Sequence, residues 1–81
     1  MPAFVILKNL KSKKADSLSE LIHIVRERFP DAYQHRAIGT GHFYVKHDGH
    51  TRIVAEFNMT QKGAFIFYRL VSKIEEAPFD N

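Results

Sequence analysis

The sequence predicts an α+β domain in which one helix packs on a small antiparallel sheet, in the order β-α-β-β-β. Three observations predict it: an apolar run near the start, one amphipathic segment with clear end signals, and alternating apolar and polar residues from residue 33 onward. Eighty-one residues with a 44% apolar fraction suit one domain over residues 1–81, whose acidic tail we expect to fray from about residue 75.

The first strand is predicted at residues 3–10, AFVILKNL. This run is nearly all apolar and contains Val and Ile, as is typical of a strand covered on both faces. The basic KSKK that follows at 11–14 predicts a solvated loop, and His35 with Arg36 predicts another.

The helix is predicted over residues 17–29. Ser17 and Glu20 have the spacing of a capping box, in which each side chain accepts a hydrogen bond from the other's backbone N–H, and Pro30 ends the segment. Apolar residues at helical spacing form one face: Leu18, Leu21, Ile22, Val25 and Phe29.

A three-stranded meander completes the predicted fold. Asp48-Gly49, between HFYVKH and HTRIVAEFNM, favours a type I′ hairpin turn because both central residues need positive φ. TQKG (60–63) predicts the second turn, and AFIFYRLVSK (64–73) predicts the last strand.

A two-residue first turn and a four-residue second loop would place Val54 opposite Arg69 and sort the meander into two faces. The face expected to receive the helix holds His42, Tyr44, Ile53, Ala55, Phe57, Met59, Ile66, Tyr68 and Leu70. A mixed face holds Phe43, Val45, His47, His50, Arg52, Val54, Glu56, Phe65, Phe67, Arg69 and Val71. On it, Arg52 and Arg69 would be neighbours, with Glu56 diagonal to Arg69.

Composition narrows the compartment and the partners. The chain has no cysteine and no apolar run near the ~20 residues of a membrane span, and its first positive charges follow the apolar stretch, unlike in a signal peptide. These features predict a soluble, cytoplasmic protein with no membrane contact. Twelve Lys and Arg against nine Asp and Glu give a net charge of +3, which permits a polyanion partner.

The mixed face carries the residue types that metal-free RNA cleavage needs. Histidine titrates near neutral pH and suits either proton step, arginine forks match phosphate oxygens, and exposed aromatic rings stack on unpaired bases. The predicted catalytic residues are His42, His47, His50, Arg52 and Arg69. The predicted substrate-binding residues are Lys46, Lys73, Phe65 and Phe67. No cofactor or metal is required, and no compact ligand spacing is present.

The same residues also fit structural roles. Arg52, Glu56 and Arg69 would then form ordinary cross-strand ion pairs on an exposed face. His47 and His50 would be solvated beside the turn, and His42 would be a partly buried histidine with one hydrogen bond.

The second half of the chain resembles the HigB branch of the RelE-like toxins, small messenger-RNA interferases of toxin–antitoxin pairs. The matching motifs are Phe29-Pro30, the Asp48-Gly49 turn, the run Arg52 to Ala55, Arg69-x-Val71 and Phe79-Asp80. The resemblance covers about residues 18 to 80 and implies a RelE-like fold, an RNA substrate and an antitoxin partner. A shorter stretch, IGTGHFYVKHDGHTRIV, is similar to the hairpin of HicA-type toxins, in which a histidine just after a Gly-Ser is the catalytic candidate. His42 is the histidine in that neighbourhood here.

Two non-catalytic alternatives stay open. Ser72-Lys73 stands where the HigB branch has Thr-His, and Phe79 where it has Tyr, which favours a binding module such as a phage-encoded inhibitor of a host protein. Such a module would bind its partner through an aromatic sheet face. The other alternative is an RNA-binding module without catalysis.

Overall fold

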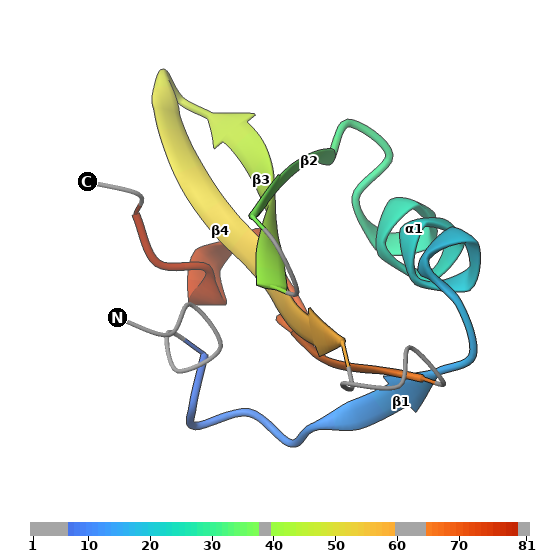
Figure 1. The fold of residues 1–81 in the computed structure, drawn as a ribbon. Coiled ribbons are helices and arrows are strands. Elements are labelled where there is room, and N and C mark those ends of the chain that lie inside the picture. Colours follow the sequence, from blue (N-terminus) through green and yellow to red (C-terminus); the bar gives the residue numbers. More distant parts are fainter. Residues whose placement is uncertain (1–6, 38–39, 60–64, 80–81) are drawn as a thin grey trace.

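A computed structural model of the protein describes residues 7–37, 40–59 and 65–79, with only the backbone described at 35–37, 40 and 59. Within them the fold is α+β, with one α-helix and a five-stranded antiparallel sheet (Figure 1). The elements are β1 (Lys13–Ala15), α1 (Leu18–Arg28), β2 (Tyr33–Ala37), β3 (Thr40–His47), β4 (His50–Met59), β5 (Ile66–Leu70) and the 3-10 helix η2 (Ile74–Glu76).

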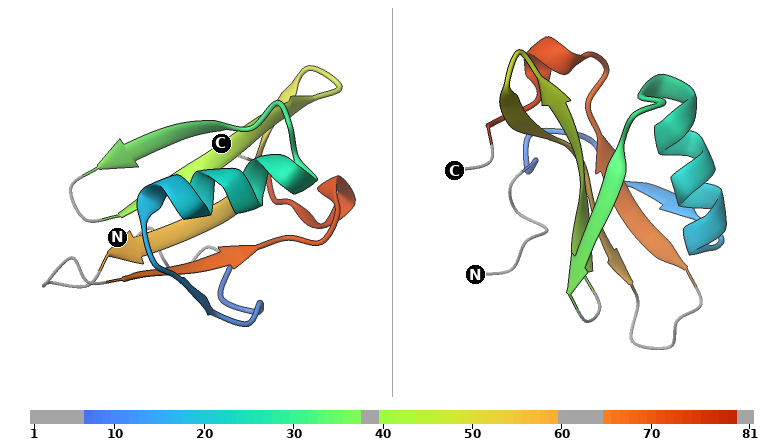
Figure 2. Two further views of the ribbon diagram at one scale, coloured as in Figure 1. Left: turned by 90° about the vertical axis from the view of Figure 1, so that its right-hand side faces the viewer. Right: turned by 90° about the horizontal axis from the view of Figure 1, so that it is seen from above.

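The sheet has the strand order β1-β5-β4-β3-β2, so the short first strand is an edge strand and pairs with the last strand, β5. The helix α1 lies on one side of the sheet, and η2 lies on the other (Figures 1 and 2). No helix in the described part of the chain is long and apolar enough to cross a membrane.

The helix confirms its predicted signals. Ser17 is the N-cap, and its Oγ accepts a hydrogen bond from the Glu20 N–H at 3.1 Å. The Phe29 N–H closes the last turn on the Val25 carbonyl at 2.8 Å. Val25, with Leu21 one turn earlier, is fully buried, as the predicted apolar stripe requires.

The first predicted strand is wrong in position. Residues 3–6 of that run lie outside the described residues, and 7–10 form a turn in which the Leu10 N–H donates to the Leu7 carbonyl at 3.0 Å. The first strand is instead β1, inside the basic KSKK run. Its lysine side chains are exposed, so it lacks the apolar alternation that marks a half-buried strand.

The prediction of a loop at His35 and Arg36 is also wrong, because both residues lie in the strand β2. It pairs with β3 from Tyr33↔Tyr44 to Ala37↔Thr40. Because β2 is an edge strand, only one side of its backbone is paired within the described sheet, and a polar sequence such as YQHRA suits that place.

The hairpin turn is as predicted. Asp48 and Gly49 have φ of 54° and 78°, and His47 pairs with His50 across them. Further along, the register shifts: Tyr44 pairs with Ile53, but Phe43 pairs with Ala55. An extra residue therefore lies in β4, a β-bulge.

The bulge corrects the predicted faces. Tyr44 and Phe43 point to opposite faces of the sheet. Ile53 pairs with Tyr44 and Ala55 pairs with Phe43, so Ile53 and Ala55 lie on opposite faces and not on the same one. Phe43, predicted for the mixed face, is fully buried and meets Phe57 at 5.6 Å between ring centroids. The core face thus keeps several predicted members (Ala55, Phe57, Ile66, Tyr68), gains Phe43, and loses His42, Tyr44 and Ile53.

Candidate functional site

Glu56 lies at the centre of the sheet, between His42 on β3 and Arg69 on β5, and is fully buried. Its Oε1 accepts a hydrogen bond from the Leu7 N–H at 2.6 Å and lies 3.6 Å from Arg69 Nη1. Its Oε2 lies 3.8 Å from His42 Nε2. The expected exposed ion pair is therefore a buried cluster, with the carboxylate directly opposite Arg69 and not diagonal to it.

Arg52 is not a neighbour of Arg69, contrary to the prediction. It pairs with Val45 on one side and forms a single bridge to Phe79 on the other. Its Nη1 donates to the carbonyls of Ile74 at 3.0 Å and Ala77 at 3.3 Å, and its guanidinium carbon lies 4.4 Å from the Phe79 ring centroid. Arg52 thus holds the C-terminal segment against the sheet.

That segment was expected to fray from about residue 75. It instead follows β4 as far as Phe79, and the Ile53 N–H donates to the Pro78 carbonyl at 2.8 Å. The segment occupies the edge of β4 beyond the end of its pairing with β5, where Ala55 meets Leu70. Residues 80–81 lie outside the described part of the chain.

The hairpin tip brings together two of the predicted catalytic histidines. His47 and His50 occupy opposite positions in the register, and Lys46 beside them is exposed. His47 Nδ1 lies 3.6 Å from Asp48 Oδ2, while the His50 ring meets the Phe79 ring edge-on at 5.4 Å. His42 and Arg69 are not part of this group, because both flank Glu56.

A basic and aromatic group lies at the other end of the sheet. Phe65 and Phe67 are 37% and 38% exposed, and their rings meet edge-on with centroids 6.1 Å apart. Lys14 pairs with Phe67 in the register, and its Nζ lies 4.4 Å from the Phe65 ring centroid, within cation–π range. Lys13 is also exposed, but it pairs with Tyr68 and therefore alternates to the opposite face of the sheet, and Lys11, exposed as well, precedes the strand.

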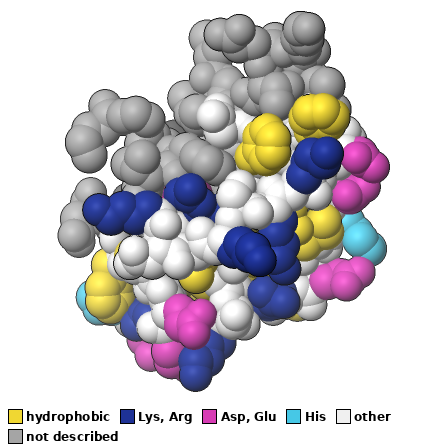
Figure 3. Space-filling model, turned by 90° about the horizontal axis from the view of Figure 1, so that it is seen from below, with side chains coloured by type: hydrophobic (Ala, Val, Ile, Leu, Met, Phe, Trp, Pro, Cys, Tyr) yellow, Lys and Arg dark blue, Asp and Glu magenta, His cyan; other side chains and the backbone are white. Residues whose placement is uncertain are grey.

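We call Lys14, Phe65 and Phe67 the basic-aromatic surface. The strand β1 lies at the bottom of Figure 1, and the view from below shows Lys and Arg side chains gathered across this side of the molecule (Figure 3). The two phenylalanines were predicted as substrate-binding residues. Lys14 was missed because KSKK was assigned to a loop; a register for β1 against β5 would have been the signal.

Two further features lie apart from this surface. Lys73, a predicted substrate-binding residue, is exposed just before η2, beyond the opposite end of β5.

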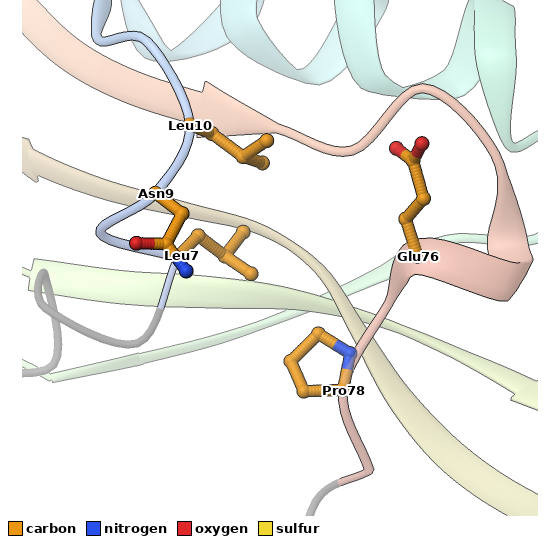
Figure 4. Close-up of a pocket in the computed structure, with 5 residues that line it drawn as sticks. All are labelled: Leu7, Asn9, Leu10, Glu76 and Pro78. Atoms are coloured by element: carbon orange, nitrogen blue, oxygen red, sulfur yellow. The ribbon is translucent and has the colours of Figure 1, made fainter.

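A pocket of about 240 Å³ lies between the turn at 7–10 and the C-terminal segment (Figure 4). Its lining is Leu7, Asn9, Leu10, Glu76 and Pro78, and it contains none of the predicted site residues.

Within the described ranges, no three histidine or carboxylate residues gather as a metal-binding group. No protein-family model, curated protein or solved structure matches the chain.

Proposed function

We propose that the protein binds single-stranded RNA through the basic-aromatic surface. The observation that carries the proposal is the arrangement of Phe65, Phe67 and Lys14, in which two exposed rings lie beside a lysine that is itself stacked on one of them. Unpaired bases stack on such rings, and a neighbouring ammonium group attracts the phosphates.

The strandedness follows from the geometry of the rings. An exposed aromatic side chain can stack only on a base whose face is free, and bases inside a duplex stack on each other. Lys14 adds a charge attraction that does not depend on sequence, in keeping with a net charge of +3. The binding is therefore expected to be salt-sensitive and tolerant of sequence.

Cleavage of the bound RNA, as in the RelE-like toxins, is the second candidate. The feature that favours it is the hairpin tip, where His47 and His50 lie opposite each other with exposed Lys46 beside them. One histidine would take the 2′-hydroxyl proton, the other would protonate the leaving 5′-oxygen, and a lysine would neutralise phosphate charge. An antitoxin partner belongs to the same proposal.

The binding proposal is tested by titrating the protein into a fluorescently labelled RNA of about eight nucleotides, single-stranded or annealed to its complement. Phe67→Ala and Phe65→Ala should each weaken binding to the single strand by about 10-fold, since stacking contributes ~1–3 kcal/mol per base. Lys14→Ala should lower the slope of log affinity against log salt by about 0.7, the value for one phosphate contact.

Phe79→Ala is the matched control, because Phe79, at 50% exposed, is an even more accessible ring outside the surface and should leave RNA affinity unchanged. Equal binding of wild type and Phe67→Ala, or a preference for the duplex, would contradict the proposal. If the protein does not bind RNA and Phe65 and Phe67 instead contact a partner protein, the alternative of an inhibitor-like binding module replaces the RNA-binding proposal.

Cleavage is tested separately by incubating the purified protein with total RNA, with and without EDTA. The proposal expects cleavage that EDTA does not affect and that His47→Ala or His50→Ala lowers. RNA left intact between pH 5 and 9 would reject catalysis and leave the binding proposal standing.

A further inference from the structure

A second group of aromatic rings lies on the sheet, at the opposite edge from β1. Tyr33 on β2 and Tyr44 on β3 are partners in the register, with ring centroids 5.7 Å apart and planes tilted by 31°. Tyr33 is 41% exposed. His42 adds a third ring, 5.9 Å from Tyr44. We call Tyr33 and Tyr44 the tyrosine pair.

The tyrosine pair faces the same way as Phe67. His42, Glu56 and Arg69 are consecutive partners across β3, β4 and β5, so they share one face of the sheet. Alternation along β3 places Tyr44 on the face of His42, and alternation along β5 places Phe67 on the face of Arg69. Both aromatic groups therefore lie on the face opposite the Phe43 core.

Each group has an exposed lysine on that face. Lys14 pairs with Phe67, and Lys46, two residues from Tyr44 on the same strand, alternates to the same side. A ring that stacks on a base thus has a cation near it for the adjoining phosphate at both ends of the face.

The centre of the face does not repel a polyanion. An open carboxylate there would oppose the phosphates, but Glu56 is fully buried beneath the Leu7 N–H and is flanked by His42 and Arg69. Its charge is met by these partners before any RNA approaches.

We infer that one RNA strand passes over this face, across the turn at 7–10 that covers Glu56 at its centre, and stacks bases on both groups, on Phe65 and Phe67 at one end and on the tyrosine pair at the other. The inference rests on the proposed function and deepens it. Three strand spacings of ~4.8 Å separate β2 from β5, and the two groups are also offset along the strands, so they lie about 20 Å apart. This distance is several times the ~3.4 Å rise between stacked bases. The bases that stack on the two groups are therefore not adjacent in the RNA.

The test compares single-stranded RNAs of about three and about eight nucleotides, only the longer of which reaches both groups. Wild-type protein should bind the longer RNA far more tightly. Tyr33→Ala should weaken binding of the longer RNA by about 10-fold, Tyr33→Phe, which keeps the ring, should lose much less, and Phe79→Ala should lose nothing. Circular dichroism and urea unfolding check that each variant is folded.

A direct contact is tested by placing one photoreactive 4-thiouridine at either end of the longer RNA. One end should crosslink near Phe65 and Phe67 and the other near Tyr33 and Tyr44. If Phe67→Ala weakens binding but Tyr33→Ala does not, and both RNA ends crosslink at the phenylalanines, the RNA does not cross the face and this inference fails alone. If neither variant weakens binding, the proposed function fails with it.

Discussion

Arg69 and Arg52 lie on neighbouring strands and were expected to act together, yet they are held in different ways. Arg69 lies beside a buried carboxylate at the centre of the sheet, 3.6 Å from Glu56 Oε1. Arg52 lies near the hairpin and donates to the carbonyls of Ile74 and Ala77. One arginine balances a charge, and the other satisfies backbone acceptors at the end of a short helix.

The difference determines how much stability the protein should lose when each group of contacts is removed. A buried ion pair that loses one member leaves an uncompensated charge, whereas a lost hydrogen bond to a part-buried backbone carbonyl leaves no net charge behind. Both arginines have structural partners, so we assign RNA contact to the side chains that remain exposed, among them Lys14, Phe65 and Phe67.

The largest expected effect comes from the centre of the sheet. Glu56→Ala removes the acceptor of the Leu7 N–H and leaves Arg69 without its carboxylate, so the free energy of unfolding should fall by about 3–5 kcal/mol. Urea unfolding measures it. Glu75→Ala, an exposed carboxylate on η2, should change stability by less than about 0.5 kcal/mol. Equal stability of the two variants would mean that the central cluster contributes nothing.

The tail arginine should have a smaller effect. Arg52→Ala removes two charge-assisted hydrogen bonds and the contact with Phe79, and we expect a loss of about 2 kcal/mol. Hydrogen exchange should report local opening first at the Ile53 amide, which donates to Pro78. If Arg52→Ala is as costly as Glu56→Ala, the contrast between the two regions is wrong.

The hairpin turn should respond least. Gly49 has φ of 78°, and a Cβ added there would meet nothing within 4 Å, so strain in the backbone is the whole cost. Gly49→Val should lower stability by roughly 1 kcal/mol or more, and Gly49→Asn, which tolerates positive φ, should lose less. Thermal melting measures both, and a neutral Gly49→Val would argue against this turn.

The helix and the hairpin could be predicted because their signals are local. Ser17 and the Asp48-Gly49 pair each act within a few residues, and both have the predicted role: Ser17 caps the helix through the Glu20 N–H, and Asp48-Gly49 forms the turn. The faces of the sheet could not be predicted, because one extra residue near Val54 reverses the alternation between Ile53 and Ala55. Nothing in the apolar pattern of β4 marks where that residue is inserted.

Edge strands were missed for a related reason. β1 and β2 each pair on one side only within the described sheet, and polar residues at such edges resemble a loop in sequence. Lys14 of the basic-aromatic surface is on β1, so an error in the fold also hid part of the candidate site. Strand alternation alone placed Phe65 and Phe67 with Arg69 on one face, and this placement brought them into the candidate site.

The central claim, that the arginines hold the fold while the basic-aromatic surface holds RNA, is tested most directly by measuring two quantities on two variants. RNA affinity and the free energy of unfolding are determined for Phe67→Ala and Arg52→Ala under the same conditions. The account predicts that Phe67→Ala weakens RNA binding by about 10-fold with little loss of stability, because its ring is 38% exposed, and that Arg52→Ala does the reverse. Stronger loss of RNA affinity in folded Arg52→Ala than in Phe67→Ala would contradict it.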